Sequence, residues 1–243
     1  MRRVLSLRPK HQASQLEDKL RERGYEVVSV AAIEIVPPTD WAPMDAILSQ
    51  VHQFDWVVFT SRNGVDAIVP RIADVSQLRN VAAIGPATRQ ALAEAGVETT
   101  FMPSVYTTKQ MAVEFPPDSG RVLMIRAQGA SEVLDLALLS HGHEVVRLDA
   151  YTSRPINQRA IRKAMNEGID AVALTSASIV ASFASAAEST GHRAEIFCIG
   201  PETFRACKQA GIEVTATAEL HTAQGLAEAM EKHDKTRETT PSE

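Results

Sequence analysis

The sequence is poor in cysteine, in long apolar runs and in positive charge. Its two cysteines, Cys198 and Cys207, are too few for a disulfide framework and lack metal-ligand spacing. We expect both to be small buried residues in a reducing compartment. No apolar stretch approaches membrane-spanning length, and no signal-peptide pattern is present, which predicts the cytoplasm. The net charge of −5 argues against binding to nucleic acid or to a membrane surface.

Several catalytic motifs are also missing. The sequence has no phosphate-binding P-loop and no G-x-G-x-x-G after a strand, which argues against ATP and NAD. None of the seven histidines has a partner at metal-ligand spacing, so we predict no metal. No Ser/His/Asp or Cys/His set can be recognised. A hydrolase with an activated nucleophile is therefore disfavoured.

The sequence contains an internal duplication. Two constant shifts align one half of the chain with the other, 115 residues for some motifs and 118 for others. The aligned pairs are T-S at 60–61 and 175–176, I-G-P-x-T at 84–88 and 199–203, and R-V-L at 3–5 and 121–123. Two diverged copies of one unit predict two similar lobes with a ligand cleft between them.

Each copy shows strands alternating with helices. In the first copy we expect strands at 4–7, 27–35, 56–60, 81–84 and 97–101, and helices at 12–23, 61–72, 86–95 and 107–115. The second copy repeats this pattern from residue 122 to about residue 230. Such alternation is typical of parallel sheets with helices on both faces. The predicted fold class is α/β, with two similar lobes that are each a parallel sheet flanked by helices.

Breaks inside the copies predict where the chain passes between lobes. Residues 36–43 and 151–155 contain prolines and are interpreted as inter-lobe linkers. Lobe 1 would then be discontinuous, formed by residues 1–35 plus 156–230, and lobe 2 would be residues 44–150. The alternative is a split near residue 118, in what looks like an ordinary loop. Residues 231–243 are charged and aperiodic, and we expect a disordered tail there.

The repeated motifs lie where strands end and helices begin. Thr60, Ser61, Thr175 and Ser176 follow apolar strands, where the free N–H groups of a first helical turn can bind an anion. The plain alternative is helix capping.

The I-G-P-x-T motifs have similar properties. Gly85 and Gly200 let the backbone turn closely, and Thr88 and Thr203 place a hydroxyl in the first helical turn. A well-capped helix is again the alternative, so all of these residues are candidate ligand contacts on the strength of the duplication.

Charged and phenolic side chains complete the candidate set. Arg8 and Arg126 end equivalent strands and Arg62 follows Ser61, so each could pair with a ligand carboxylate or be a solvated surface arginine. Tyr151 follows the strand expected at 144–149. Its phenol could donate a proton to a substrate, or its ring could pack against the hinge.

These motifs, in this order and spacing, resemble the uroporphyrinogen-III synthase family over residues 2 to about 230. The motifs that carry the resemblance are V-V-F-T-S-R-N-G-V at 57–65, I-G-P-A-T at 84–88, R-V-L-M-I-R at 121–126, Y-T-S at 151–153, L-T-S-A-S at 174–178, I-G-P-E-T at 199–203 and H-T-A-Q-G-L at 221–226. There are two departures. Glu202 places a carboxylate beside Thr203, and the I-R-A-Q-G-A run at 125–130 is less glycine- and charge-rich than the family's usual loop.

The resemblance implies a cyclising lyase. Such an enzyme closes hydroxymethylbilane, a linear tetrapyrrole polycarboxylate, to uroporphyrinogen III with loss of water and inversion of ring D through a spiro intermediate. It implies two lobes joined by a two-stranded linker, with no metal or organic cofactor. Tyr151 matches the family's linker tyrosine and is the candidate proton donor. We expect a monomer that meets hydroxymethylbilane synthase transiently.

Two other functions remain open at this point. A non-catalytic binding or sensor protein for a small polyanion would show the same duplication and the same helix starts. A sugar- or nucleotide-processing enzyme of similar build would need a phosphate loop or an acidic metal motif, and neither is recognisable. Catalytic turnover and the role of Tyr151 discriminate among them.

Overall fold

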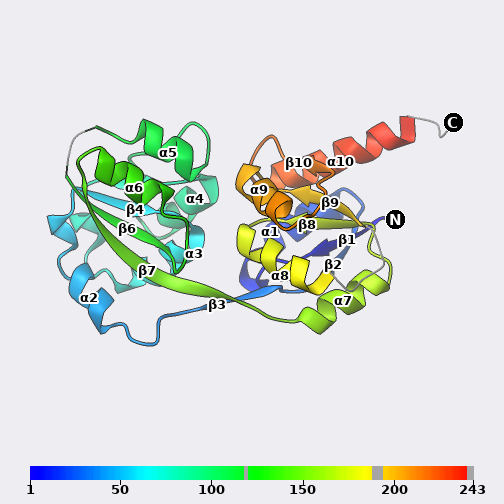
Figure 1. Cartoon of the computed structure of the whole chain (residues 1–243), viewed down its shortest axis with the longest axis horizontal. Helices are drawn as coiled ribbons and strands as arrows, with labels where there is room; N and C mark the ends of the chain where they lie inside the picture. Colours follow the sequence, from blue (N-terminus) through cyan, green and yellow to red (C-terminus); the bar gives the residue numbers. More distant parts are fainter. Residues whose placement is uncertain (118–119, 188–193, 240–243) are drawn as a thin grey trace. The chain divides into compact units, whose positions relative to one another are not determined.

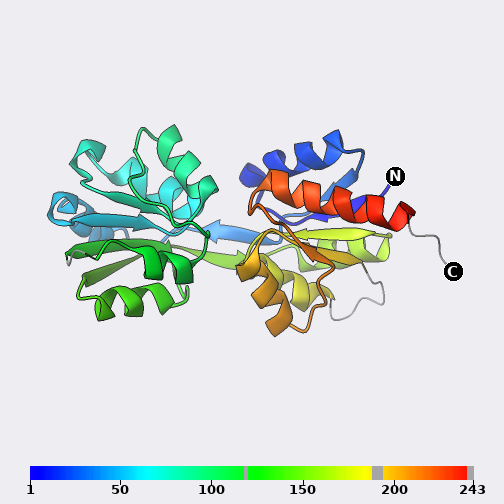
Figure 2. The same cartoon turned by 90° about the horizontal axis from the view of Figure 1, so that it is seen from above.

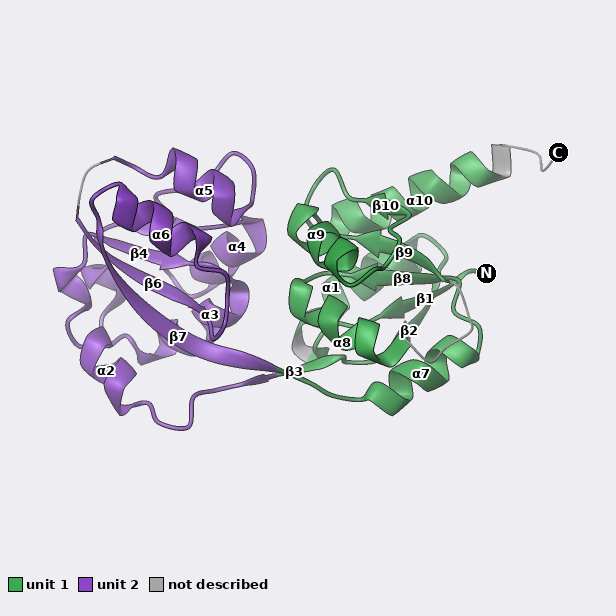
Figure 3. Ribbon diagram, in the orientation of Figure 1, with its two compact units in different colours: residues 1–34, 154–243 green, residues 35–153 purple. Residues whose placement is uncertain are grey.

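The computed structural model describes residues 1–117, 120–187 and 194–239. The chain divides into two compact units (Figure 3), unit 1 with Met1–Glu34 and Arg154–Glu243 and unit 2 with Ile35–Ser153. Each unit is a five-stranded sheet covered by helices (Figure 1). The predicted α/β class, with parallel sheets flanked by helices, is confirmed.

Unit 1 is built on the strand order β10-β9-β8-β1-β2, with parallel pairing throughout. Its strands are β1 (Arg3–Ser6), β2 (Glu26–Ser29), β8 (Ala171–Leu174), β9 (Glu195–Cys198) and β10 (Ala216–Thr217). Its helices are α1 (Lys10–Glu22), α7 (Gln158–Asn166), α8 (Ala177–Ala187), α9 (Pro201–Gln209) and α10 (Ala223–Thr239). Helices α1 and α10 cover one face of this sheet, and α7, α8 and α9 cover the other (Figure 2).

Unit 2 has the strand order β3-β7-β6-β4-β5. Its strands are β3 (Ile33–Val36), β4 (Trp56–Phe59), β5 (Val81–Ala83), β6 (Arg121–Ala127) and β7 (Glu144–Pro155), and β3 and β7 each extend two residues beyond the unit boundary. Its helices are α2 (Ala42–Leu48), α3 (Arg62–Ile68), α4 (Pro86–Glu94), α5 (Thr108–Glu114) and α6 (Val133–Ser140). Short 3-10 turns lie at Val51–Gln53, Val69–Arg71 and Val75–Gln77.

The duplication is visible in the sheets. The order β9-β8-β1-β2 in unit 1 matches β5-β4-β6-β7 in unit 2. Strands from both copies meet in each sheet, because β1 pairs with β8 in unit 1 and β4 pairs with β6 in unit 2.

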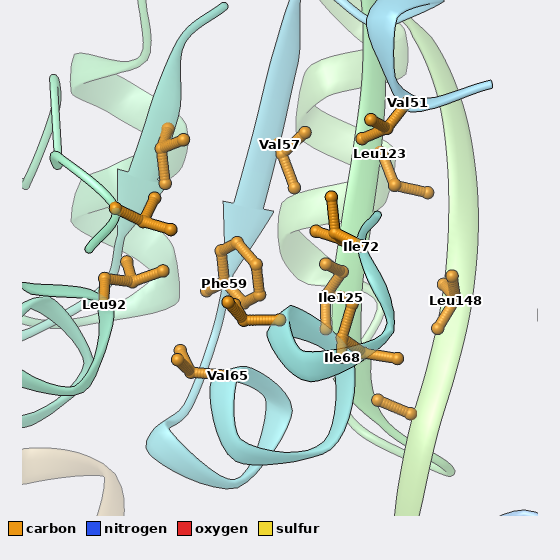
Figure 4. Close-up of a cluster of buried hydrophobic side chains, with 14 of the residues drawn as sticks. Val51, Val57, Phe59, Val65, Ile68, Ile72, Leu92, Leu123, Ile125 and Leu148 are labelled. Carbon is orange, nitrogen blue, oxygen red and sulfur yellow. The ribbon is translucent and has the colours of Figure 1, made fainter. Parts of the chain in front are cut away.

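Each sheet buries an apolar layer under its helices. In unit 2, Val65 and Ile68 of α3 pack on Phe59 and Ile125 of the strands (Figure 4). Burial of such side chains is the main favourable term in folding. In unit 1 the sheet packs on α1 and α10 through Val4, Leu16, Leu20, Phe197, Leu226 and Met230.

The two cysteines lie in unit 1 and are both fully buried. Their Sγ atoms are 3.5 Å apart and both are free thiols. The expectation of small buried residues is confirmed.

Three predicted elements need correction. The strand expected at 27–35 is two strands, β2 and β3, because the chain leaves one sheet there and joins the other. The strand expected at 97–101 is reduced to one bridge between Phe101 and Ala82. The helix expected at 61–72 is α-helical only to Ile68, since a 3-10 turn with Pro70 in its first positions follows.

Parts of the expected linkers and tail lie in strands and helices, and the boundary between the units at Ser153 and Arg154 falls within 151–155. Residues 151–155 belong to β7, which is continuous from Glu144 to Pro155, and the first expected linker, 36–43, overlaps β3 and α2. The tail expected at 231–243 is helical as far as Thr239, and residues 240–243 lie outside the described part of the chain. Long-range contacts hold this helix, including a 2.8 Å hydrogen bond from the Tyr25 phenol to Asp234.

Candidate functional site

In each unit, the candidate residues lie where helices follow the carboxyl ends of parallel strands. Helices α3 and α4 follow β4 and β5 in unit 2, and α8 and α9 follow β8 and β9 in unit 1. The first-turn N–H groups of these helices therefore lie at the sheet edge where ligands bind in open α/β sheets.

Ser61 and Tyr151 meet at this edge in unit 2. Ser61 is the N-cap of α3, and its Oγ accepts a hydrogen bond from the Gly64 N–H at 3.2 Å. The Tyr151 hydroxyl lies 2.8 Å from the same Oγ, although the two residues are 90 positions apart in the chain. Tyr151 is only 7% exposed, with its ring in the apolar cluster under α3. The ring is packed, as one of the two alternatives expected, and the hydroxyl has Ser61 as a polar partner, while the role of proton donor stays a prediction.

Thr60 has a different environment from its neighbour. Its backbone N–H and its side-chain hydroxyl both donate to the Ile125 carbonyl oxygen, each at 3.1 Å. Thr60 therefore ties the end of β4 to β6 and holds the start of α3 in place.

Unit 1 repeats this arrangement without the phenol. Ser176 precedes α8, and its Oγ accepts from the Ile179 N–H at 3.3 Å and lies 3.2 Å from Ser178 Oγ. Thr175 is half-buried at the end of β8. Under the shift of 118, the counterpart of Tyr151 is Ile33.

The two glycine turns are tightly packed. Gly85 and Gly200 are the N-caps of α4 and α9, in extended conformation and without a side-chain capping bond. A Cβ on Gly85 would lie 3.4 Å from the Tyr106 Cβ, and one on Gly200 would lie 3.1 Å from the His221 ring. The contact at Gly85 is an ordinary van der Waals distance, whereas the His221 ring leaves little room for a side chain at Gly200.

Tyr106 and His221 are residues that the sequence reasoning missed. They occupy equivalent positions under the shift of 115, directly before the repeated threonines Thr107 and Thr222. Extending the alignment by one residue would have found them. Burial lowers the pKa of His221, so its ring is neutral near pH 7.

The threonines of the glycine turns point inward. Thr88 and Thr203 lie in the first turns of α4 and α9 and are 5% and 3% exposed. Their placement makes them supports of the helix start more than open ligand contacts.

The three candidate arginines differ in their burial and in their ion pairs. Arg62 pairs with Glu94 at 2.9 Å and with Asp66 at 3.6 Å, and Arg8 is half-buried after β1.

Arg126 is 4% exposed as a residue, and its Nη1 lies 2.5 Å from Oδ2 of Asp135. Sequence reasoning missed Asp135, because no local signal marks a buried carboxylate on α6. Arg126 is thus engaged inside unit 2 rather than turned toward a ligand.

Glu202, one of the two departures from the family pattern, is neutralised locally. Its Oε1 lies 2.5 Å from Nη2 of Arg205, one turn along α9. An ion pair of this kind reduces the repulsion between Glu202 and an anion at the start of α9.

The sequence matches the model of a known family over most of its length. The model is described as uroporphyrinogen-III synthase HemD and matches residues 14–228. The chain belongs to the uroporphyrinogen-III synthase family. The resemblance noted from the motifs is confirmed, and members of this family are cyclising lyases of porphyrin biosynthesis that act on a linear tetrapyrrole.

Individual relatives agree with this family. The chain is 29% identical to a uroporphyrinogen-III synthase of Synechococcus elongatus, with 94% of each chain covered. It is 25% identical to a uroporphyrinogen-III synthase of Chlorobaculum parvum, covering 95% of this chain and 98% of that one.

Solved structures of the family share the fold. A mutant uroporphyrinogen III synthase of Thermus thermophilus matches with a TM-score of 0.68 and 16% identity, covering 97% of this chain and all of that one. The enzyme of Helicobacter pylori matches with a TM-score of 0.62 and 17% identity, covering 94% and 97%. At these identities the likeness concerns the fold alone.

The described residues contain neither a cluster suited to a metal ion nor a helix suited to a membrane. No group of three or more His, Cys, Asp and Glu side chains in residues 1–117, 120–187 and 194–239 is arranged to hold a metal ion. Within the same ranges, no helix combines the length and the apolar content that crossing a bilayer requires.

Proposed function

We propose that this protein closes hydroxymethylbilane to uroporphyrinogen III, with loss of water and inversion of ring D through a spiro intermediate. The observation that carries the proposal is the contact between Tyr151 and Ser61. It places a phenol at the carboxyl edge of a parallel sheet, beside a helix start, in a chain of this family.

The proton required for loss of the substrate hydroxyl comes from Tyr151. Ser61 Oγ accepts the Gly64 N–H, so its own hydroxyl proton is free to point toward the Tyr151 oxygen. In that arrangement the phenol proton points away from Ser61 and can be given to the substrate. Ser61 then donates to the phenolate that is left, which lowers the cost of the transfer.

The carboxylates of the substrate bind at the helix starts. The first-turn amides after Thr60, Gly85, Thr175 and Gly200 supply N–H donors and the positive end of the helix dipole. Ser61 and Ser176 border the first turns of α3 and α8, while Thr88 and Thr203 support those of α4 and α9. Backbone amides provide most of this binding because few cationic side chains take part.

The cationic contribution is assigned to Arg8 and Arg62. Arg62 already pairs with Glu94 and Asp66, so substrate binding would exchange carboxylate partners at its guanidinium. The main task of the enzyme is geometric, since holding ring D in the inverted orientation selects the type-III product. Positioning of this kind accounts for large accelerations without a strong acid or base.

The setting of the reaction is also part of the proposal. The protein works in the cytoplasm as a monomer and receives its substrate from hydroxymethylbilane synthase in a transient encounter. Support comes from the free thiols Cys198 and Cys207, which suit a reducing compartment.

A coupled assay tests the function. Hydroxymethylbilane is generated in situ by its synthase, this protein is added, and the oxidised porphyrins are separated by chromatography into type I and type III. Type III that rises with the amount of protein is the expected result. Type I alone, from protein with a folded circular-dichroism spectrum, would contradict the proposal and leave a polyanion-binding protein.

A further inference from the structure

Strand β7 carries one residue more than β6 at the point where Tyr151 lies. The two strands pair residue by residue as far as Arg126 and Asp149, and the next pair is Ala127 with Tyr151. Ala150 is the extra residue of a β-bulge. Bulges beside functional sites commonly redirect a side chain.

Here the bulge decides which face of the sheet Tyr151 occupies. Before it, alternate residues of β7, Val146 and Leu148, face the apolar cluster under α3, and Ala150 belongs to that cluster too. In a regular strand Tyr151 would share the opposite face with Arg147 and Asp149. With the bulge, Tyr151 joins the cluster under α3, where its hydroxyl meets Ser61.

A group of charged side chains lies on the opposite face beside the bulge, and two of its members, Arg126 and Asp135, are buried. Asp135 of α6 is fully buried, with Oδ2 2.5 Å from Nη1 of Arg126 and Oδ1 2.6 Å from Nε of Arg147. Asp149, the last residue before the bulge, has its Oδ1 3.8 Å from Nε of Arg126. The Asp135 carboxylate therefore links β6 and β7 close to the bulge.

The same arginine also holds the loop that follows β6. A second Arg126 nitrogen, Nη2, donates to the carbonyl oxygen of Ala130. Within that loop, the Gln128 N–H donates to the Tyr151 carbonyl oxygen at 2.8 Å. Arg126 thus contacts the loop after β6, and the same loop binds the Tyr151 backbone through Gln128.

We propose that Arg126 and Asp135 are positioning residues for Tyr151. Their ion pair maintains the bulge between β6 and β7, and the bulge directs the phenol toward Ser61 and the substrate. This inference rests on the proposed function for its kinetic consequence, but the direction of Tyr151 in the free protein can be measured without any substrate.

Two variants and two controls separate positioning from plain stability. Asp135→Asn keeps the shape of the side chain and removes its charge, and Arg126→Lys keeps the charge but loses the planar fork. Leu138→Ala is the destabilised control, because Leu138 is a fully buried residue of the same helix that packs in the cluster on this face. Arg121→Gln removes an exposed ion pair with Glu144, between the same two strands at their other end.

The first readout is the resonance of the Tyr151 ring. The protein has three tyrosines, so ring-labelled tyrosine gives a simple spectrum that Tyr151→Phe assigns. Asp135→Asn and Arg126→Lys should shift or broaden the Tyr151 signal. Leu138→Ala and Arg121→Gln should leave it in place. An unmoved Tyr151 signal in folded Asp135→Asn and Arg126→Lys would overturn the inference, whatever the activity.

The second readout is a double-mutant cycle in the coupled assay. Asp135→Asn alone should lower kcat about tenfold with KM within about twofold, because the lost alignment acts on the reacting step. In a Tyr151→Phe background the same substitution should cost less than about twofold, since the two changes remove one contribution. If the kcat losses of Asp135→Asn and Tyr151→Phe multiply in the double variant, the ion pair of Arg126 and Asp135 has only a structural role. An equal kcat loss in Leu138→Ala, measured at the same folded fraction, would mean the same. If the wild type shows no synthase activity, the proposed function fails and the resonance still tests the positioning.

Discussion

The Tyr151 hydroxyl lies 2.8 Å from Oγ of Ser61, the residue that caps helix α3. This contact joins a strand from the second copy of the duplication to a helix start from the first. It gives the start of α3 a phenol that its counterpart in unit 1 lacks.

Replacing Tyr151 by phenylalanine should slow the proposed reaction without abolishing it. The ring remains packed in the cluster under α3, so the fold is kept, while the proposed proton donor is lost. General-acid contributions of this kind are on the order of a hundredfold in kcat. Steady-state rates of type-III formation measure the effect. Full activity in a folded Tyr151→Phe variant would exclude the donor role.

Ser61→Ala and Ser176→Ala form a matched pair. Each removes an N-cap hydroxyl, so each should lower the free energy of unfolding by about 1 kcal/mol. Only Ser61 also contacts Tyr151, so Ser61→Ala should lower kcat more than Ser176→Ala does. Denaturant unfolding and the coupled assay measure the two effects. Equal kinetic losses in both variants would mean that the Tyr151 contact has no part in the reaction.

Gly225→Ala should strongly destabilise unit 1. A Cβ on Gly225, in the first turn of α10, would overlap the Leu220 carbonyl oxygen, so the backbone must move. Forced overpacking of this kind costs about 1–3 kcal/mol or more. Gly85→Ala is the control, because its Cβ would make only an ordinary 3.4 Å contact with Tyr106. Thermal melts compare the two, and equal melting temperatures would contradict the packing of α10.

Glu195 should make the docking of α10 sensitive to acid. Burial alone would raise its pKa, but hydrogen bonding to Arg2 and the charges of Arg2 and Arg237 outweigh burial and hold the pKa below its usual value. A carboxyl whose pKa is lower in the folded state stabilises that state at neutral pH and stops doing so as the pH falls through the folded pKa.

The measurement is the melting temperature of the wild type and of Glu195→Gln against pH. The wild type should be more stable at pH 7, and the difference should shrink below about pH 4, where glutamates protonate. Glu213→Gln, at an exposed position, is the control and should change little. A constant difference between wild type and Glu195→Gln down to pH 3 would show that the Glu195 charge is not involved.

Much of the fold could be predicted because its signals are local. Alternating apolar strands and helices define parallel α/β sheets, and capping by Ser61 depends on an amide only three residues away. The duplication added the equivalence of the two sets of helix starts. Where prediction failed, long-range contacts decided. Residues 231–239 look like a tail by composition, yet Tyr25, 209 positions from Asp234, holds that segment as helix.

The sequence by itself determined the class of fold, the repeated helix starts and the family, since periodicity, capping and motif spacing are properties of neighbouring residues. Only the tertiary structure decided which candidates meet. Tyr151 reaches Ser61 because one extra residue in β7 changes its face of the sheet, and Arg126 turns to Asp135 because α6 packs a carboxylate behind it. The direction of a side chain at the end of a strand depends on register and on packing between strands, and a strand's own sequence does not specify these.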